Sequence, residues 1–233
     1  EVNIKLDVIE DISRMYGYNN LPSTLMESSN YISEKNTYYR DKNALKDALV
    51  AAGALETLTY TFTSKEKLDE LGFDENDIRS KYLKVINPLG EDTGYMRTSM
   101  MVSILEALSF NYSRKNKERV LFEVGNVFFN DKFDELGLPL QKEHLVIGKY
   151  NTDFFEIKGI VEYLFNKFRI KGVKFIKAEE NMLHPSRSAY VCIDDKIIGY
   201  IGNVHPVLLK KYNLKEDVVV AELDVKTIIE LYD

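Results

Sequence analysis

The chain has 233 residues, of which 45% are hydrophobic and 29% are charged, and its formal net charge is −6. This length and composition suit one large or two small globular domains and exclude a disordered or fibrous protein. The negative charge disfavours generic binding to polyanions, so a nucleic-acid contact would need a local basic patch.

The cysteine count and the length of the apolar runs indicate in which cellular compartment the protein is found. The single cysteine, Cys192, excludes an internal disulfide and a zinc site built from several cysteines, and it indicates a reducing compartment. The apolar runs are far shorter than a membrane span. We therefore expect a cytoplasmic protein without membrane contact. Because the chain opens at Glu1 rather than at Met, we also expect it to be a piece of a longer protein.

The first 25 residues predict a separate segment. "KLDVIEDISRMYG" (5–17) places apolar side chains at helical spacing and ends on Gly17, which predicts a helix. "YNNLPSTLMESSN" is rich in Asn, Ser and Pro and indicates a linker. We therefore predict that residues 1–25 are the tail of a preceding small domain and its linker, and that 26–233 form a core domain.

The remaining sequence predicts helices and strands connected largely by hairpins. The expected helices cover 37–53, 64–73, 98–114, 153–168, 205–213 and the end of the chain. The expected strands cover 56–64, 81–89, 119–129, 143–150, 173–178 and 217–225, with a hairpin over 188–204 that turns at Asp194-Asp195-Lys196. This order predicts an α+β fold around a largely antiparallel sheet flanked by helices. The absence of a glycine-rich phosphate loop weighs against a dinucleotide or P-loop enzyme.

Four carboxylates near the N-terminus are candidate metal ligands. Asp7, Glu10 and Asp11 lie at i, i+3 and i+4 and share one face of the predicted helix, with Glu1 just upstream. A hard cation such as Mg²⁺ would relieve their mutual repulsion. A solvated acidic first turn, which the helix dipole favours, explains the same pattern. From spacing alone we favour the solvated turn.

Histidines and serines offer a second kind of candidate. His144, His184 and His205 lack the spacing of zinc ligands, and we expect capping or packing roles for the two that precede prolines, His184 and His205. Ser186 and Ser188 lie close to His184, but no GxSxG turn is present, so nucleophilic catalysis is disfavoured.

One basic stretch could contact phosphate. "RKNKER" (114–119) follows a predicted helix, whose C-terminus favours cations in any case. We interpret it as a solvated loop. From the residues alone, the chain is an α+β domain whose task is open.

Five blocks in order resemble the beta subunit of bacterial phenylalanine–tRNA ligase, and together they cover nearly the whole chain. The longest, "INPLGEDTGYMRTSMMVSILEALSFNYSRKNKERVLFEVGNVF" (86–128), is similar to a family pattern of NPL, then LRTSLLP with a leucine-rich helix, then a strand LFEIG-x-VF. The others are "LDVIEDISRMYGYNNLP" (6–22), "DFFEIKGIVEYL" (153–164), "HPSRSAYV" (184–191) and "IIGYIGNVHPVLLKKYNL" (197–214).

The resemblance implies a class II aminoacyl-tRNA synthetase fold in a non-catalytic copy. In the catalytic alpha subunit, the strand comparable to 125–129 reads like GRVYR, and its last arginine binds ATP phosphate. Here Phe129 stands at that position, and the C-terminal "AELDVKTIIELYD" lacks the GxGxxR signature of the third class II motif. A phenylalanine cannot stabilise a phosphate anion electrostatically. We therefore expect no catalytic and no cofactor-binding residues in this chain.

The resemblance also implies partners and a metal. It implies pairing with the alpha subunit, in a heterotetramer of two alpha and two beta subunits that attaches phenylalanine to tRNA(Phe) with ATP and Mg²⁺. Residues 37–63 resemble the dimer-forming first motif of class II enzymes, and we expect helix 37–53, with Leu49, in the heterodimer interface. The family's pattern of metal ligands corresponds to Glu1, Asp7, Glu10 and Asp11. The resemblance therefore favours a Mg²⁺ site over a solvated turn. We expect this chain alone to hold Mg²⁺ weakly or not at all.

Two alternatives remain open. The chain could be an active adenylate-forming enzyme of the same fold, which an arginine at 129 or a GxGxxR tail would have favoured. It could also be a tRNA-binding module, which the net negative charge disfavours.

Overall fold

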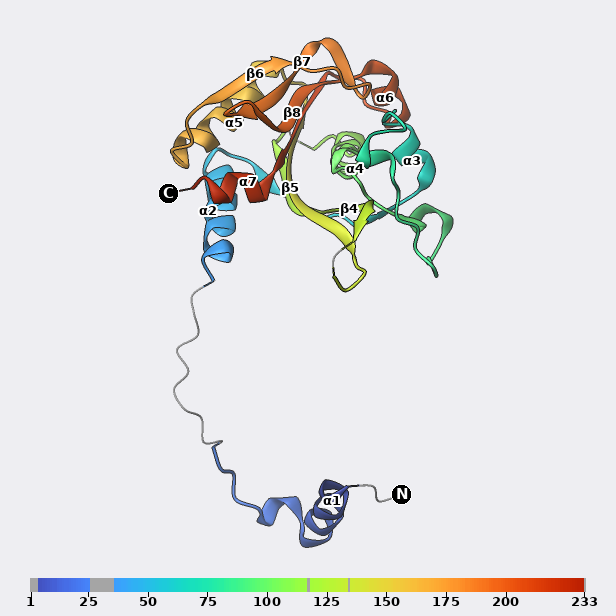
Figure 1. Ribbon diagram of the computed structural model, residues 1–233, viewed down its shortest axis with the longest axis vertical. Helices are drawn as coiled ribbons and strands as arrows, with labels where there is room; N and C mark the ends of the chain where they lie inside the picture. The colour runs from blue at the N-terminus through green and yellow to red at the C-terminus, as the bar shows by residue number, and fades with distance from the viewer. Residues whose placement is uncertain (1–3, 26–35, 117, 134, 233) are drawn as a thin grey trace. The chain divides into compact units, whose positions relative to one another are not determined.

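The computed structural model describes residues 4–25, 36–116, 118–133 and 135–232 (Figure 1). The chain divides into two compact units, Glu1–Asn36 and Thr37–Asp233. The predicted boundary near residue 25 adjoins 26–35, which lie outside the described residues, and it stays a prediction. Each helix in the described ranges is too short or too polar to cross a lipid bilayer.

The first unit contains α1 (Lys5–Tyr16) and a short 3-10 helix, η1 (Tyr18–Asn20). The helix predicted over 5–17 is confirmed. It ends at Gly17, whose φ of 94° lies in the region that favours glycine.

The second unit is built on a seven-stranded sheet with the order β1-β4-β5-β9-β8-β7-β6. In the described part of the chain, β1 pairs in parallel with β4, and every other neighbouring pair of this sheet is antiparallel. The predicted α+β fold around a largely antiparallel sheet is therefore confirmed. The strands are β1 (Leu55–Glu56), β4 (Leu121–Phe133), β5 (Pro139–Tyr150), β6 (Val173–Lys177), β7 (Leu183–Ile193), β8 (Lys196–Val204) and β9 (Val218–Asp224).

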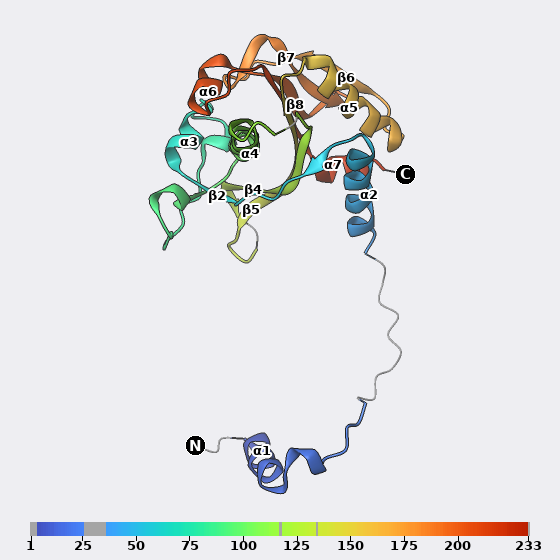
Figure 2. The ribbon, with the colours of Figure 1, turned by 180° about the vertical axis from the view of Figure 1, so that it is seen from behind.

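The sheet curves around α4 and carries the other long helices on its outer face, as both views show (Figures 1 and 2). Apolar side chains of the outer face pack against α2, α5 and α7 in one core, and those of the inner face pack against α4 and α6 in a second core. The helices of this unit are α2 (Thr37–Ala51), α3 (Lys65–Asp69), α4 (Met101–Ser113), α5 (Phe154–Lys167), α6 (Pro206–Lys211) and α7 (Val225–Glu230).

Local sequence signals explain several element ends. Asp153 caps α5 by accepting hydrogen bonds from Phe155 N (2.8 Å) and Glu156 N (3.0 Å), and Ser64 caps α3 by accepting from Lys67 N (3.3 Å). The predicted β7–β8 hairpin is confirmed: its turn places Asp194 and Asp195 at φ values of 46° and 67°, which residues of this type tolerate.

Two predicted strands are wrong. Of residues 56–64, only Glu56, the end of β1 (Leu55–Glu56), and Phe62–Thr63 (β2) are in strands, because the chain leaves β4 after Thr57 and then pairs with β3 (Tyr95–Met96). Residues 81–89 form a single bridge, between Lys84 and Tyr95, and two 3-10 turns, η2 (Ile78–Ser80) and η3 (Glu91–Thr93), flank them. Around that bridge, Met96 N donates to the carbonyl oxygen of Leu83 (3.0 Å) and Val85 N donates to that of Gly94 (2.9 Å), so a neighbour is present but the contact is too short to form a strand.

Candidate functional site

The inner face of the sheet holds a buried carboxylate at the N-terminus of α4. Glu222 of β9 accepts hydrogen bonds from His144 Nδ1 (2.7 Å), Tyr200 Oη (2.5 Å), Ser99 Oγ (2.7 Å) and the backbone N of Met100 (3.1 Å). The helix N-terminus adds a favourable dipole for the negative charge. The chain therefore binds one of its own side chains where a helix N-terminus could otherwise bind an anionic ligand.

These contacts stabilise the ionised form of Glu222. Burial acts to raise the pKa of Glu222, but the hydrogen bonds and charge of His144 and the hydrogen bonds of Tyr200 and Ser99 outweigh burial and lower this pKa to about 2. Burial and the charge of Glu222 in turn raise the pKa of Tyr200 well above its ordinary value. The cluster thus holds one fixed negative charge and a neutral phenol.

A second buried charge, Arg97, lies beside the "EVGN" stretch of β4. Its guanidinium is 2% exposed and donates to Glu123 Oε1 (3.0 Å) and to the carbonyl oxygen of Asn126 (2.9 Å). A Cβ added to Gly125 would lie 2.3 Å from Arg97 Nη2, so the glycine leaves room for the arginine. Glu123 and the backbone of Asn126 therefore bind the guanidinium of Arg97, and Gly125 leaves space for it.

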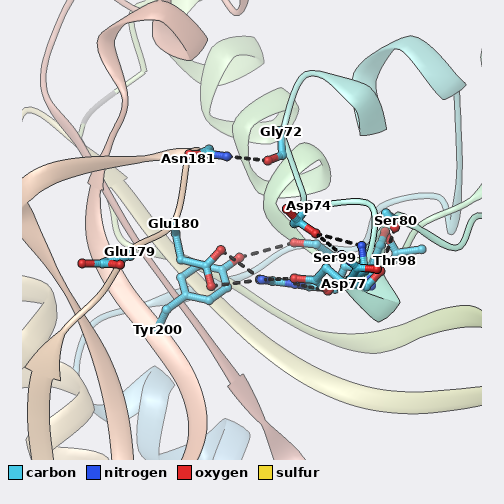
Figure 3. A network of polar contacts seen from close by, with 12 residues as sticks. Gly72, Asp74, Asp77, Ser80, Thr98, Ser99, Glu179, Glu180, Asn181 and Tyr200 are labelled. Atoms are coloured by element: carbon cyan, nitrogen blue, oxygen red, sulfur yellow. Dashed lines mark hydrogen bonds and ion pairs between the residues drawn. The ribbon is translucent and has the colours of Figure 1, made fainter.

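Arg79 is a third paired charge, and it is partly buried, with its side chain 22% exposed. Its guanidinium donates to Asp77 Oδ2 (2.6 Å) and to both carboxylate oxygens of Glu180 (3.0 Å each). Figure 3 shows Glu180 beside Tyr200, across from Asp77 and Ser99. Burial acts to lower the pKa of Arg79, but these two carboxylates outweigh burial and raise it. Two carboxylates neutralise this guanidinium.

A pocket of about 410 Å³ opens beside these clusters. Arg79, His144, Glu180, Tyr200 and Glu222 line it, together with the exposed Lys142 and Lys196. Its buried cationic or titratable groups are held by carboxylates of the same chain. Arg79 and His144 are thus held by internal contacts, and Lys142 and Lys196 are the exposed cations at this pocket.

Phe129 lies on the same inner face. It is buried in the core formed with α4, and in the β4–β5 ladder it stands opposite Leu140. The position that the resemblance compares with a phosphate-binding arginine is therefore occupied by a packed aromatic ring.

The predicted metal ligands lie in the first unit, on α1. Asp7 Oδ2 accepts a hydrogen bond from Ile4 N (3.0 Å), and Asp11 pairs with Arg14 (3.1 Å). Glu10 lies between them and is exposed, and Glu1 is outside the described residues. In the described ranges, no three His, Cys, Asp or Glu residues form a group that could hold a metal ion. The described carboxylates do not by themselves form a ligand set, and the Mg²⁺ site stays a prediction.

The remaining candidates have local roles. His205 caps α6 by accepting from Val207 N (3.2 Å), as expected. His184 Nδ1 lies 3.2 Å from Ser186 Oγ and accepts from Ser186 N (3.3 Å), which is a turn contact at an exposed position. His144, in contrast, pairs with Glu222, a partner that the sequence did not suggest.

The prediction that Leu49 lies in the heterodimer interface is wrong. Leu49 is fully buried in the chain's own outer-face core, so a charge there would disturb the fold before it reached any partner. Tyr39 and Val50 of α2 do face outward, so the prediction for the helix itself stays a prediction. In the segment after the helix, Leu58 is 85% exposed and Tyr60 is 84% exposed, with Leu55 and Phe62 on either side of them. This segment continues from β1, an edge strand of the sheet.

A family model described as the phenylalanyl tRNA synthetase beta chain CLM domain matches residues 21–225. The phenylalanine–tRNA ligase beta subunit of Clostridium acetobutylicum is 34% identical over 232 residues, which are 99% of this chain and 29% of that protein. The beta subunit of Clostridium tetani is also 34% identical, over 99% of this chain and 29% of that protein. The chain thus spans about three tenths of the length of these curated relatives.

Solved structures show the same fold. Pyrrolysyl-tRNA synthetase from Desulfitobacterium hafniense matches with a TM-score of 0.69 and 12% identity, over 99% of this chain and 82% of that chain. A second structure of that synthetase matches with a TM-score of 0.68 and 12% identity, over 86% of this chain and 68% of that chain. The predicted class II aminoacyl-tRNA synthetase fold is therefore confirmed, as a fold.

Proposed function

Because the chain belongs to the family of the phenylalanyl tRNA synthetase beta chain CLM domain, we propose that it is a non-catalytic body that supports a catalytic alpha subunit. In this proposal the whole ligase, with two alpha and two beta subunits, attaches phenylalanine to tRNA(Phe) in the cytoplasm. ATP and Mg²⁺ act in that assembly, and this chain performs no chemical step.

The internal ion pairs of the inner face are the main support for the proposal that this chain is non-catalytic. An adenylate-forming site needs free cationic groups for phosphate, because electrostatic stabilisation of the transition state is usually the largest catalytic contribution. Here Arg97 is held by Glu123, and Arg79 by Asp77 and Glu180. Phe129 is packed in the core and offers no charge. The synthetase-shaped face is thus stabilised by its own side chains.

Pyrophosphate exchange tests the absence of catalysis. The chain alone, incubated with ATP, Mg²⁺ and labelled pyrophosphate, is expected to give no exchange that depends on phenylalanine. Exchange above background would refute the proposal and favour an active adenylate-forming enzyme. A salt-sensitive shift of tRNA(Phe) by the chain alone would instead favour a tRNA-binding module.

The exposed edge beside β1 is the surface that we assign to the alpha subunit. Leu58, Tyr60 and Phe62 lie at alternating positions and are exposed, and large exposed apolar side chains that gather on one segment mark interaction sites. Aromatic residues are enriched in the cores of protein interfaces. The edge also leaves one side of β1 without a strand neighbour among the described residues.

Charge substitutions test this surface. Tyr60→Asp is expected to leave the chain folded and to weaken co-purification with the alpha subunit at least tenfold, because a charge would be desolvated in the interface. Phe110→Asp is the matched control: Phe110 is an exposed aromatic residue on α4, outside this edge. Equal assembly of both variants with the alpha subunit would contradict the assignment.

The metal site is proposed for the whole ligase. Glu1, Asp7, Glu10 and Asp11 would take part in binding Mg²⁺ when the rest of the enzyme is present. Titration of the assembled ligase with Mn²⁺, with and without Glu10→Ala, is expected to show one high-affinity site fewer in the variant. An unchanged number of sites would refute a role for this carboxylate.

A further inference from the structure

The face of α5 that points away from the sheet carries two exposed aromatic side chains. Phe155 is 75% exposed and Tyr163 is 39% exposed. Positions 155, 159 and 163 are four residues apart, so they follow one line along the helix surface. Large exposed apolar side chains that gather on one element mark interaction sites. The opposite face of the helix packs into the outer-face core through four buried side chains, Ile157, Val161, Leu164 and Phe165.

Gly159 lies between the two aromatic positions, in the middle of α5. A glycine inside a helix is less favourable than an alanine, because it loses more backbone entropy on folding. Close packing within the chain explains such a residue at Gly125, but a Cβ added to Gly159 would meet nothing within 4 Å beyond the helix backbone around it. The described part of the chain therefore does not need this glycine, and a close approach from outside the chain accounts for it.

The carboxylates beside this line are turned towards solvent. Glu156 pairs with Lys149 at 2.6 Å, and their side chains are 43% and 15% exposed. Glu162 pairs with Lys158, and their side chains are 46% and 23% exposed. In each pair the carboxylate is the more exposed member, so an approaching molecule meets negative charge around the aromatic rings. Lys and Arg side chains fit this surface, because they pair with carboxylates and are attracted to ring faces.

The N-terminal end of α5 extends the same surface. A pocket of about 440 Å³ opens beside Phe155, and Asp153 and Asp217 line it together with Arg187, which pairs with Asp217 at 3.0 Å. The pocket has room for a side chain of a partner, and its charge favours a basic one. The same carboxylates disfavour a nucleic acid or an anionic membrane. A second copy of this face would place like charges against each other.

We propose that the outward face of α5 binds a basic helix from the part of the beta subunit that lies beyond this chain. An apolar side chain of that helix packs over Gly159, between Phe155 and Tyr163, as a ridge of one helix packs into a groove of another. Lys or Arg residues on either side of it contact Glu156 and Glu162. The inference rests on the proposed function only in taking this chain as part of a longer beta subunit.

The size of the surface favours a segment of the same polypeptide. A single helix face is small, and interfaces between domains of one chain are smaller and more polar than those of obligate complexes. A linked segment also acts at a high effective concentration, so few contacts suffice to hold it. The beta subunit of Clostridium acetobutylicum has 71% of its length outside the region that this chain matches, since the match covers 29% of it.

Thiol labelling of Asn166→Cys tests whether the face is covered. Asn166 is exposed on the same face, one turn after Glu162, and the chain's own Cys192 is buried. The new thiol is expected to react with a maleimide roughly tenfold or more slowly in the complete beta subunit than in this chain alone, because a covered thiol reacts only when the contact opens. Mass spectrometry of the labelled peptide measures both rates. Equal rates would overturn the proposal.

Gly159→Leu separates the need of a partner for the glycine from the need of the chain itself. In this chain alone the variant should raise the urea midpoint, because leucine has the higher helix propensity and meets no neighbour. In the complete beta subunit it should remove the protection of Asn166→Cys, because its side chain occupies the place of the partner's. A lowered midpoint would show that the fold needs the glycine, and unchanged protection would exclude a close approach; either result would overturn the proposal.

A charge reversal tests the basic character of the partner. Glu162→Lys in the complete beta subunit should speed the labelling of Asn166→Cys roughly tenfold, because a basic helix would then be repelled. Glu66→Lys, at an exposed position on α3, is the matched control and should leave the rate unchanged. Equal effects of the two reversals, or none from Glu162→Lys, would contradict a basic partner.

Other occupants of the face give different results. Protection of Asn166→Cys that appears only when the alpha subunit is added would assign the face to that subunit. Protection in this chain alone that grows with its concentration would assign it to a second copy. Either result would overturn the source proposed here. The proposed function is tested separately, since phenylalanine-dependent pyrophosphate exchange by the chain would refute that function whatever the labelling rates are.

Discussion

Replacing Glu222 by Gln removes the charge at the centre of the inner face while keeping its shape. The carboxylate accepts four hydrogen bonds, from His144, Tyr200, Ser99 and Met100 N. A glutamine has a single acceptor oxygen, and its NH₂ group would face two donors. At least one buried donor then lacks a partner, which costs about 1–3 kcal/mol.

The pKa of Glu222 gives an independent magnitude. Folding lowers this pKa from 4.5 to about 2, so the unfolded chain binds the proton more tightly than the folded chain. The stability from the ionised carboxylate is therefore fully present above pH 4.5 and is lost as the pH falls from 4.5 towards 2. The difference, 4.5 less about 2, at about 1.36 kcal/mol for each pKa unit, amounts to about 3 kcal/mol.

Urea denaturation of both proteins between neutral pH and pH 2.5 measures the effect. At neutral pH, Glu222→Gln should be less stable than the unsubstituted chain by about 3 kcal/mol, and this gap should shrink as Glu222 becomes protonated. Glu66→Gln, at an exposed position, should show almost no gap at any pH. A gap for Glu222→Gln that is independent of pH would refute the reasoning.

The remaining predictions concern the stability of the same unit, measured by urea denaturation at neutral pH. Arg97→Met should cost about 3–5 kcal/mol because Glu123 stays buried and unpaired, and removing both charges should restore most of the loss; failure of the double variant to recover would contradict this. Gly125→Ala should cost about 1–3 kcal/mol by displacing Arg97, and a neutral effect would argue against the close approach. Leu49→Ala should cost about 2–5 kcal/mol, whereas an interface residue would cost almost nothing in the isolated chain. Asp153→Ala should cost about 1 kcal/mol through loss of the α5 cap, and an unchanged midpoint would exclude that role.

The sequence predicts elements well where a local signal coincides with a long apolar pattern. The α5 helix with its Asp153 cap and the β7–β8 hairpin with its Asp194-Asp195 turn are such cases. The strands expected over 56–64 and 81–89 fail for a non-local reason. Their composition favours a strand, but whether a ladder partner is available depends on segments distant along the chain.

The candidate site is less accessible to sequence reasoning. Glu123 and Glu222 are visible as single charges within apolar strands, which marks them as unusual. Their partners are not marked: Arg97 is 26 residues from Glu123, and Ser99 is 123 residues from Glu222. The resemblance led to the family and to Phe129, but the internal pairing of Arg97 and Arg79 was missed.

The glycine beneath Arg97 has a consequence for how the chain behaves beside an active partner. Since the guanidinium is seated over Gly125 and neutralised by Glu123, its neighbourhood needs no nucleotide or added ion to take shape. In the proposed assembly with an alpha subunit, we expect this face to keep one conformation whether the partner is empty, loaded or turning over. It can act as a fixed reference against which the moving parts of a catalytic cycle are aligned.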